Sequence, residues 1–406
     1  MNQKTRGANA VKAAAPSLFT LVIAASVGPL AMNVFLPSLP NMAAHFKVSY
    51  ATTQLLVSLY LVALAVTQLF IGPASDRFGR RPVMLICFAI FIAATIAAIY
   101  APTMQVLLAI RVLQAFSAAG VVLSRAIVRD TVGAEDAASR IGYITMGMSV
   151  TPMIAPFIGG HLDELYGWQS TFWLTAALAS VALVFLYFDL RETNHNRSVS
   201  IAAQFRSYPE LLGSRRFWGY SMIATFTSGV FFAFLGGGPF VATEILGLSP
   251  SRYGLYFGII SLGYMLGNFI AGRFSRTVGL NRMMLAGNLV NCAGIVICYV
   301  LFQAGFVHAL SLFAPAGLIG VGNGMTMPNA NAGMVSVKPR LAGSASGLGG
   351  ALTMAGSALL AAAGGAMLSV QSGPYPMLLI MFGSSIVSTL TSIFVLRRER
   401  SVGKLP

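Results

Sequence analysis

Twelve long apolar runs limit the fold of this chain more than any other feature. Each is about twenty residues long, the length that an α-helix needs to cross a bilayer. The mean hydropathy of +0.76 and the hydrophobic fraction of 56% also exceed what a soluble domain carries. The sequence therefore predicts an all-α integral membrane protein with twelve transmembrane helices. The predicted spans are residues 17–37, 54–73, 82–100, 104–124, 142–160, 170–188, 218–240, 253–272, 282–303, 309–328, 341–368 and 375–396.

The net charge of +15 is spread unevenly over the predicted loops. Nearly all of the 26 Lys and Arg residues fall in segments on the same side as the two termini. Lys47 and Arg252 fall on the other side, and Arg111 lies inside a span. Because basic residues are retained on the cytoplasmic side of membranes, we predict that both termini are cytoplasmic. The charge is thus interpreted as an orientation signal, and no nucleic-acid partner is expected.

A polar, basic connection divides the spans six and six. We predict an N-terminal six-helix bundle over residues 1–189, a cytoplasmic linker over residues 190–217, and a C-terminal six-helix bundle over residues 218–406. The linker composition is typical of a boundary between domains. A short helix on the membrane surface is predicted within residues 205–212.

The two halves also repeat a short motif after their second span. Three small residues that follow the second span recur after the eighth span, six spans further along the chain. Such internal symmetry is typical of secondary transporters. They are Gly72, Ser75 and Gly79, which recur as Gly272, Ser275 and Gly279. The acid Asp76 has no counterpart, because Arg276 stands in its place.

Residues 72–82 concentrate charge in a chain in which 9% of residues are charged. One interpretation is a solvated turn whose arginines fix the orientation in the membrane. The other is a structured switch at a helix junction. Orientation requires neither the two glycines nor the acid between them, so the second interpretation is favoured. The predicted gating residues are Gly72, Asp76, Arg77, Gly79 and Arg80.

Arg111 is the one basic residue predicted inside a span. A lone guanidinium at that depth costs about 2.5–3.5 kcal/mol on insertion scales, and intramembrane ionisable groups usually line a functional pathway. Alternatively, the guanidinium is satisfied by carbonyl groups and by Gln114, one turn away. Asn33 lies at a comparable depth and could hydrogen-bond Arg111. All eleven acids fall in loops or at span ends, so the sequence indicates no carboxylate relay through the membrane.

Three further groups are candidates for the transport machinery. The fifth span carries Pro152, Pro156, Gly159 and Gly160, a combination that predicts a deformable helix with close neighbours. The aromatic residues of the seventh span either line a cavity or make lipid and packing contacts. The tenth span ends in an asparagine-rich segment. The predicted substrate and coupling cavity comprises Asn33, Arg111, Gln114, Phe226, Phe232, Asn329 and Asn331.

No motif predicts a cofactor or a metal site. Cys87, Cys292 and Cys298 all lie in apolar runs, and the four histidines have no ligand spacing. A membrane enzyme is one alternative, but no nucleophile or acid pair appears at membrane depth. A glycine-rich phosphate loop is also missing from the sequence, so ATP hydrolysis is not expected.

Taken together, the motifs resemble those of major facilitator superfamily transporters of the drug:proton antiporter group, and most closely the Bcr/CflA type of bacterial multidrug efflux pumps. The resemblance covers almost the whole chain. The matching segments are residues 72–81, 111–116, 125–130, 152–160, 238–241, 247–250 and 322–333.

This resemblance implies alternating access by two six-helix bundles around a cavity lined by the first, fourth, seventh and tenth spans. It implies export of small amphipathic compounds by a monomer in the bacterial inner membrane, coupled to protons or another ion. Asp76 is expected to cap the start of the eleventh span, with Arg77 and Arg80 adding bonds to this gate. Arg111 is expected to act in coupling. The subfamily commonly has an acid where this chain has Asn33, and an importer or a metabolite exporter on the same fold remains an alternative.

Overall fold

The computed structural model describes residues 16–132, 134–194, 208–338 and 341–402, and these segments are helical without any strand. Within these described segments, twelve helices or broken helices are long and apolar enough to cross a membrane, which confirms the predicted number of spans. The elements are α1 (Leu18–Asn33), η1 (Leu36–Ser38), α2 (Leu39–Phe46), α3 (Tyr50–Phe78), α4 (Arg80–Ile99), α5 (Met104–Leu113), η2 (Gln114–Ser117), α6 (Ala118–Thr131), α7 (Ala134–Tyr166), α8 (Gln169–Asp189), α10 (Tyr208–Leu212), α11 (Arg215–Phe240), η3 (Val241–Ile245), α12 (Pro250–Val278), α13 (Leu280–Gln303), α14 (Ala309–Ser336), α15 (Ala342–Ala366) and α16 (Tyr375–Val402).

Several spans are longer than their apolar runs. The first was predicted to end at Pro37, but helical structure continues through η1 and α2 to Phe46. The break between α1 and α2 coincides with prolines at positions 37 and 40, which lack the backbone N–H that a continuous helix requires. The fourth span is also broken, because the 3₁₀ segment η2, which begins at Gln114, separates α5 from α6 close to Arg111. Within the predicted surface helix, the described part forms α10.

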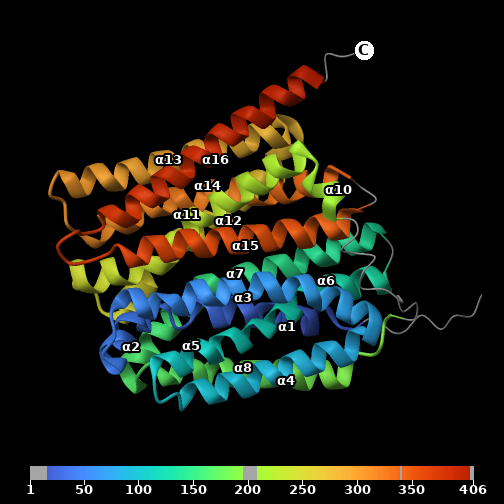
Figure 1. Cartoon of the computed structure of the whole chain (residues 1–406), viewed down its shortest axis with the longest axis horizontal. Helices are drawn as coiled ribbons and strands as arrows, with labels where there is room; N and C mark the ends of the chain where they lie inside the picture. The colour runs from blue at the N-terminus through green and yellow to red at the C-terminus, as the bar shows by residue number, and fades with distance from the viewer. Residues whose placement is uncertain (1–15, 133, 195–207, 339–340, 403–406) are drawn as a thin grey trace, which may run out of the picture.

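The chain forms two groups of helices, α1–α8 and α11–α16, which occupy the lower and upper parts of Figure 1. Two pairs of long helices make most of the contact between the groups: α3 packs along α15, and α7 packs along α12. We call the end at which α1 begins and α16 ends the proximal end, and the opposite end the distal end.

Hydrophobic packing differs between these two ends. At the distal end one cluster extends across both groups and includes Leu36, Tyr50, Leu235 and Tyr253. At the proximal end, the described residues form separate clusters, one within α1–α8 and two within α10–α16. The two groups are therefore joined through a shared core at the distal end, whereas their proximal cores are independent.

The contact between α7 and α12 requires glycine. A Cβ atom on Gly160 would lie 2.3 Å from the carbonyl oxygen of Pro250, and one on Gly254 would lie 2.3 Å from that of Pro156. No larger residue fits at these positions without moving a helix backbone. The two glycines, one from each helix, thus let the groups touch backbone to backbone.

Candidate functional site

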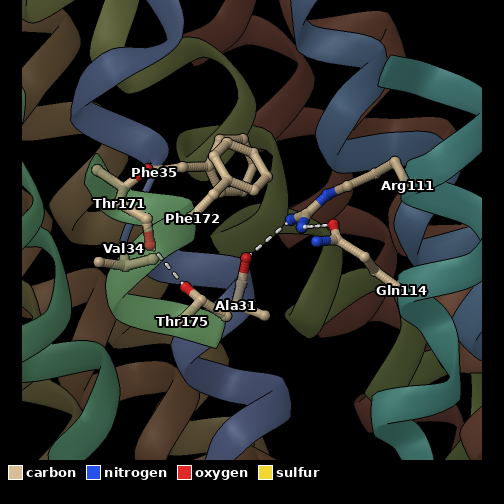
Figure 2. Close-up of a pocket in the computed structure, with 8 residues that line it drawn as sticks. All are labelled: Ala31, Val34, Phe35, Arg111, Gln114, Thr171, Phe172 and Thr175. Carbon is tan, nitrogen blue, oxygen red and sulfur yellow. Dashed lines mark hydrogen bonds between the residues drawn. The ribbon is translucent and has the colours of Figure 1, made fainter. Parts of the chain in front are cut away.

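The side chain of Arg111 is buried, with 1% of its surface exposed, and every side of its guanidinium is occupied. Nη2 donates to the carbonyl oxygen of Ala31 at 2.9 Å, and Nε donates to that of Leu56 at 3.1 Å. Nη1 donates to Oε1 of Gln114 at 2.7 Å. Figure 2 shows the side chain reaching from α5 toward Ala31 on α1. One guanidinium therefore joins α1, α3 and the α5–η2 break.

Two aromatic rings enclose the same guanidinium. Its central carbon lies 4.3 Å from the ring centre of Phe35 and 4.2 Å from that of Tyr60, within the range of a cation–π contact. The Tyr60 hydroxyl hydrogen-bonds Ser117 at 2.7 Å, and Gln114 donates onward to Thr95 at 2.9 Å. Among the described residues no carboxylate lies within ion-pair distance of Arg111. This environment matches the alternative interpretation, in which carbonyl groups and Gln114 satisfy the guanidinium.

Asn33 does not make the hydrogen bond to Arg111 that the sequence suggested. Its Nδ2 donates to the carbonyl oxygen of Pro29 at 2.7 Å, while its buried Oδ1 has no partner among the described residues. Each of the three guanidinium nitrogens of Arg111 already donates to another acceptor, two main-chain carbonyl groups and Gln114. Asn33 bonds back onto its own helix at the end of α1.

A small pocket borders Arg111 between α1, α5–η2 and α8 (Figure 2). Its space is too narrow to admit a water molecule. The pocket is therefore a packing defect inside the first helix group, and it cannot accept a substrate in this conformation. Its lining residues are Ala31, Val34, Phe35, Arg111, Gln114, Thr171, Phe172 and Thr175.

The other predicted cavity residues lie in the second helix group. Phe226 and Phe232 on α11 are half-buried, and the Phe226 carbonyl accepts from Ser384 at 2.9 Å. On α14, Asn329 is buried and donates to the Met325 carbonyl oxygen at 2.8 Å, whereas Asn331 is exposed. Within the described part of the chain, no hydrogen bond joins these four residues to Arg111 or Asn33. The predicted cavity residues of the second group are thus not linked to Arg111 by hydrogen bonds among the described residues, and their shared role in a cavity stays a prediction.

The charged stretch at residues 72–82 is a junction between two helices with a single residue between them. Gly79 separates α3 from α4 at φ 104° and ψ 152°, a conformation that only glycine adopts readily. Arg80 begins α4 and pairs with both Asp76 and Asp130, the latter at 2.9 Å. The described contacts of Asp76 stay within the first helix group, and exposed Arg77 lies over the ring of Phe78.

Glu192, just after the sixth span, is part of this junction and was missed by the sequence analysis. Its carboxylate accepts from the backbone N–H of Arg80 at 2.9 Å and from that of Arg81 at 3.3 Å. It therefore caps the N-terminus of α4, where the helix dipole favours negative charge. Asn194 adds a bond from its Nδ2 to the carbonyl oxygen of Asp76 at 3.0 Å. An isolated acid in a basic linker was the only sequence signal.

The second copy of the motif has the same backbone geometry. Gly279 separates α12 from α13 at φ 91°, and its N–H donates to the Ser275 carbonyl oxygen at 3.0 Å, as Gly79 does to Ser75. The described residues contain no ion pair at this second junction. The repeat is therefore a repeated hinge shape, and only its first copy carries a charge network.

The fifth-span residues form the contact surface of α7. Pro156 and Gly160 touch α12, and the Pro152 carbonyl oxygen accepts from Ser261 on α12 at 3.4 Å. Gly159 faces α1 instead, where a Cβ would lie 1.7 Å from the Val34 carbonyl oxygen. The predicted close-packing helix is thus present, with its two glycines serving different neighbours.

Further bonds across the distal end involve residues that the sequence analysis did not select. The Tyr50 hydroxyl on α3 donates to the Gly236 carbonyl oxygen on α11 at 2.7 Å. Glu164 on α7 accepts from the backbone N–H of Ser251, in the first turn of α12, at 3.0 Å. These bonds tie the two helix groups together where they share a hydrophobic core.

Twelve spans in two halves, with the same hinge repeated after the second span of each, are the architecture of a secondary transporter. The chain belongs to the Major Facilitator Superfamily, because the model of that family matches residues 21–249 and 238–406. The family resemblance inferred from the motifs is thereby confirmed. The protein is a multi-pass membrane transporter whose substrate is a small molecule.

The chain is similar over most of its length to several bacterial proteins. It is 28% identical to multidrug resistance protein D of Escherichia coli over 91% of this chain and 93% of that protein. It is 26% identical to the bicyclomycin resistance protein homolog of Haemophilus influenzae, with 94% and 96% covered. Among solved structures, a bacterial homolog of the human lysosomal transporter Spinster matches with a TM-score of 0.73 at 16% identity, covering 94% of this chain and 96% of that one.

Proposed function

We propose that this protein exports small amphipathic compounds, including drugs, across the bacterial inner membrane, and that a proton gradient drives the export. The relatives named for multidrug and bicyclomycin resistance support this substrate class and direction. The transporter is proposed to act as a monomer. Its two moving parts are the helix bundles of residues 1–189 and 218–406, which are joined by the linker of residues 190–217.

The observation that carries the mechanism is the unequal packing of the two ends. A shared core and hydrogen bonds close the distal end, while separate cores leave the proximal halves free to move apart. In alternating access, the two halves rock about a fixed site so that one end closes as the other opens. In the proposed cycle, this conformation is the one that loads substrate from the proximal side.

The proximal end is proposed to face the cytoplasm. Arg80, Arg129 and Arg215 lie at this end, together with most of the other basic residues that the structure describes. The positive-inside rule places such residues in the cytoplasm. Substrate would then enter from the cytoplasm and leave at the distal end, which is the direction required for export.

The charge network at the α3–α4 junction is proposed to act as the proximal gate. In the present state Asp76 is held by Arg80 within its own half. When the proximal halves approach, the carboxylate of Asp76 becomes available to the N-terminus of α15, where a helix dipole attracts negative charge. Arg111 is assigned a different role, as a cross-link that keeps α1, α3 and α5 together while the half moves as one body.

The experiment that tests this function is expression in a bacterium that lacks its own efflux pumps, followed by growth on a panel of toxic compounds. We expect higher tolerance and lower intracellular accumulation for amphipathic compounds, both lost when the proton gradient is collapsed. An unchanged accumulation for every compound would refute drug export. Increased accumulation of a compound would instead support the alternative of an importer on the same fold.

A further inference from the structure

Asp163 differs from the other acids of this chain in being buried. It lies in the last turn of α7 at the distal end, with 5% of its surface exposed. Among the acids whose side chains the structure describes, no other is buried. The neighbouring acid in the chain, Glu164, is exposed and accepts the bond from Ser251 across the two halves. Two consecutive carboxyl groups thus have opposite environments.

The carboxyl group of Asp163 has little compensation for a negative charge. Oδ2 accepts from Nδ2 of Asn41 at 2.5 Å, but the buried Oδ1 has no hydrogen-bond partner among the described residues. The hydroxyl of Ser38 lies beside the carboxyl and is itself buried without a partner. Burying an unpaired charge is costly, and the C-terminal turn of a helix further disfavours an anion. The neutral acid suits this site better, because a neutral carboxyl group avoids the cost of a buried charge that is only partly compensated by hydrogen bonds.

Charged and titratable groups around this site do not supply the missing compensation. On α7, Glu164 is occupied by Ser251, and His161 lies near the Phe157 carbonyl oxygen at 3.0 Å. The facing elements carry four such groups: His45 at the end of α2, Lys47, Glu244 in η3, and Arg252 in the first turn of α12. The His45 ring packs on Trp168. In the described part of the chain, no basic residue lies within ion-pair distance of Asp163.

The location of Asp163 links its burial to closure of the distal end. Ser38 ends η1, the short break in the first span, and η1 packs against α7 as well as against α11 and α12 of the other half. When the halves separate at the distal end, η1 loses its contacts with α11 and α12, and water reaches the site. A solvated aspartate is ionised at neutral pH, so closing the distal end again requires either a buried anion or a proton.

We propose that Asp163 takes up one proton from the distal solution as the distal end closes. The proton forms an O–H bond on the carboxylate, and opening of the distal end returns it to water. External protons therefore favour the proximal-open state, which is ready to load substrate. This inference deepens the proposed proton-driven export by naming a residue through which external pH acts on the conformational cycle.

The test measures conformation directly in lipid nanodiscs without substrate. A variant that lacks the three native cysteines carries spin labels at Tyr166→Cys and Val307→Cys, two exposed distal positions in different halves. We expect acid to favour the short label distance, and the closed-to-open ratio to change by up to about tenfold per pH unit, the limit for one proton. Asp163→Asn should remain closed without responding to pH. The matched control Glu164→Gln should keep the pH response.

A second variant keeps the test decisive if Asp163→Asn does not fold. Asn41→Leu removes the hydrogen bond that Oδ2 accepts while leaving Asp163 in place, so the midpoint of the transition should move to higher pH. A pH response that persists in Asp163→Asn, or a midpoint unchanged in Asn41→Leu, would overturn the inference. The spin-label measurement needs no drug, so its outcome is independent of the export assay. If the protein exports drugs but its conformation does not respond to pH, only the role of Asp163 is refuted. If its conformation responds to pH but no drug is exported, only the proposed function is refuted.

Discussion

Replacement of Arg111 by methionine separates a cross-linking role from a role in coupling. Methionine retains much of the side-chain volume but removes all three hydrogen bonds that the guanidinium donates. The carbonyl oxygens of Ala31 and Leu56 and Oε1 of Gln114 then lose their guanidinium partner in a buried site. The two ring contacts, with Phe35 and Tyr60, lose their cation.

The magnitude follows from opposing terms. Each lost hydrogen bond to the charged guanidinium costs ~1.5–3 kcal/mol, or about 6 kcal/mol for three. The ring contacts add ~1–2 kcal/mol each. In the opposite direction, the loss of a charged group from membrane depth stabilises the protein by ~2.5–3.5 kcal/mol. The net expectation is a destabilisation of about 6 kcal/mol, which is a large share of the stability of a typical domain.

Thermal unfolding of the purified protein, followed by fluorescence, measures this effect. We expect Arg111→Met to lower the Tm by several degrees, and Arg111→Lys to fall in between, because an ammonium group cannot reach three acceptors on different helices. Export in proteoliposomes is measured on the same preparations at equal amounts of folded protein. If Arg111→Met unfolds like the wild type and yet loses transport, the guanidinium acts in coupling and the cross-link interpretation fails.

Three other substitutions test the hinges and the contact surface. Asp76→Asn should slow export more than Arg276→Ala at equal expression, since only the first junction has a charge network; equal rates would contradict this asymmetry. Gly79→Ala should cost ~1–3 kcal/mol in thermal stability because of its glycine-only dihedral angles, and an unchanged Tm would be contrary to that geometry. Gly254→Val should shift the distal spin-label distance toward the open state, because its Cβ meets a backbone carbonyl at 2.3 Å; a distance like that of the wild type would argue against this contact.

Features with a clear periodicity or composition could be predicted from the sequence. The number of spans follows from hydropathy. The repeated hinge follows from Gly79 and Gly279, because both residues have a positive φ angle that favours glycine. The extension of the first span to Phe46 was not predicted, since its second part is short and amphipathic and gives no long apolar run.

The site was less predictable, because main-chain groups leave no mark in a sequence. The partners of Arg111 include carbonyl oxygens of Ala31 and Leu56, which any residue could supply. Asn33 lies at a depth comparable to that of Arg111, but depth does not determine which way a side chain points. Asp163 and Glu192 were grouped with ordinary acids at span ends, and only packing distinguishes a buried carboxyl and a helix cap from solvated charges.

Opening of the distal end during transport is the central requirement of this mechanism. In a variant without native cysteines, Glu164→Cys and Ser251→Cys place two thiols where the halves touch, and a bifunctional thiosulfonate reagent can join them through reducible bonds. Drug export is then measured in proteoliposomes before cross-linking, after it, and after reduction. The account predicts that export stops on cross-linking and returns on reduction. Export at an undiminished rate by fully cross-linked protein would contradict it.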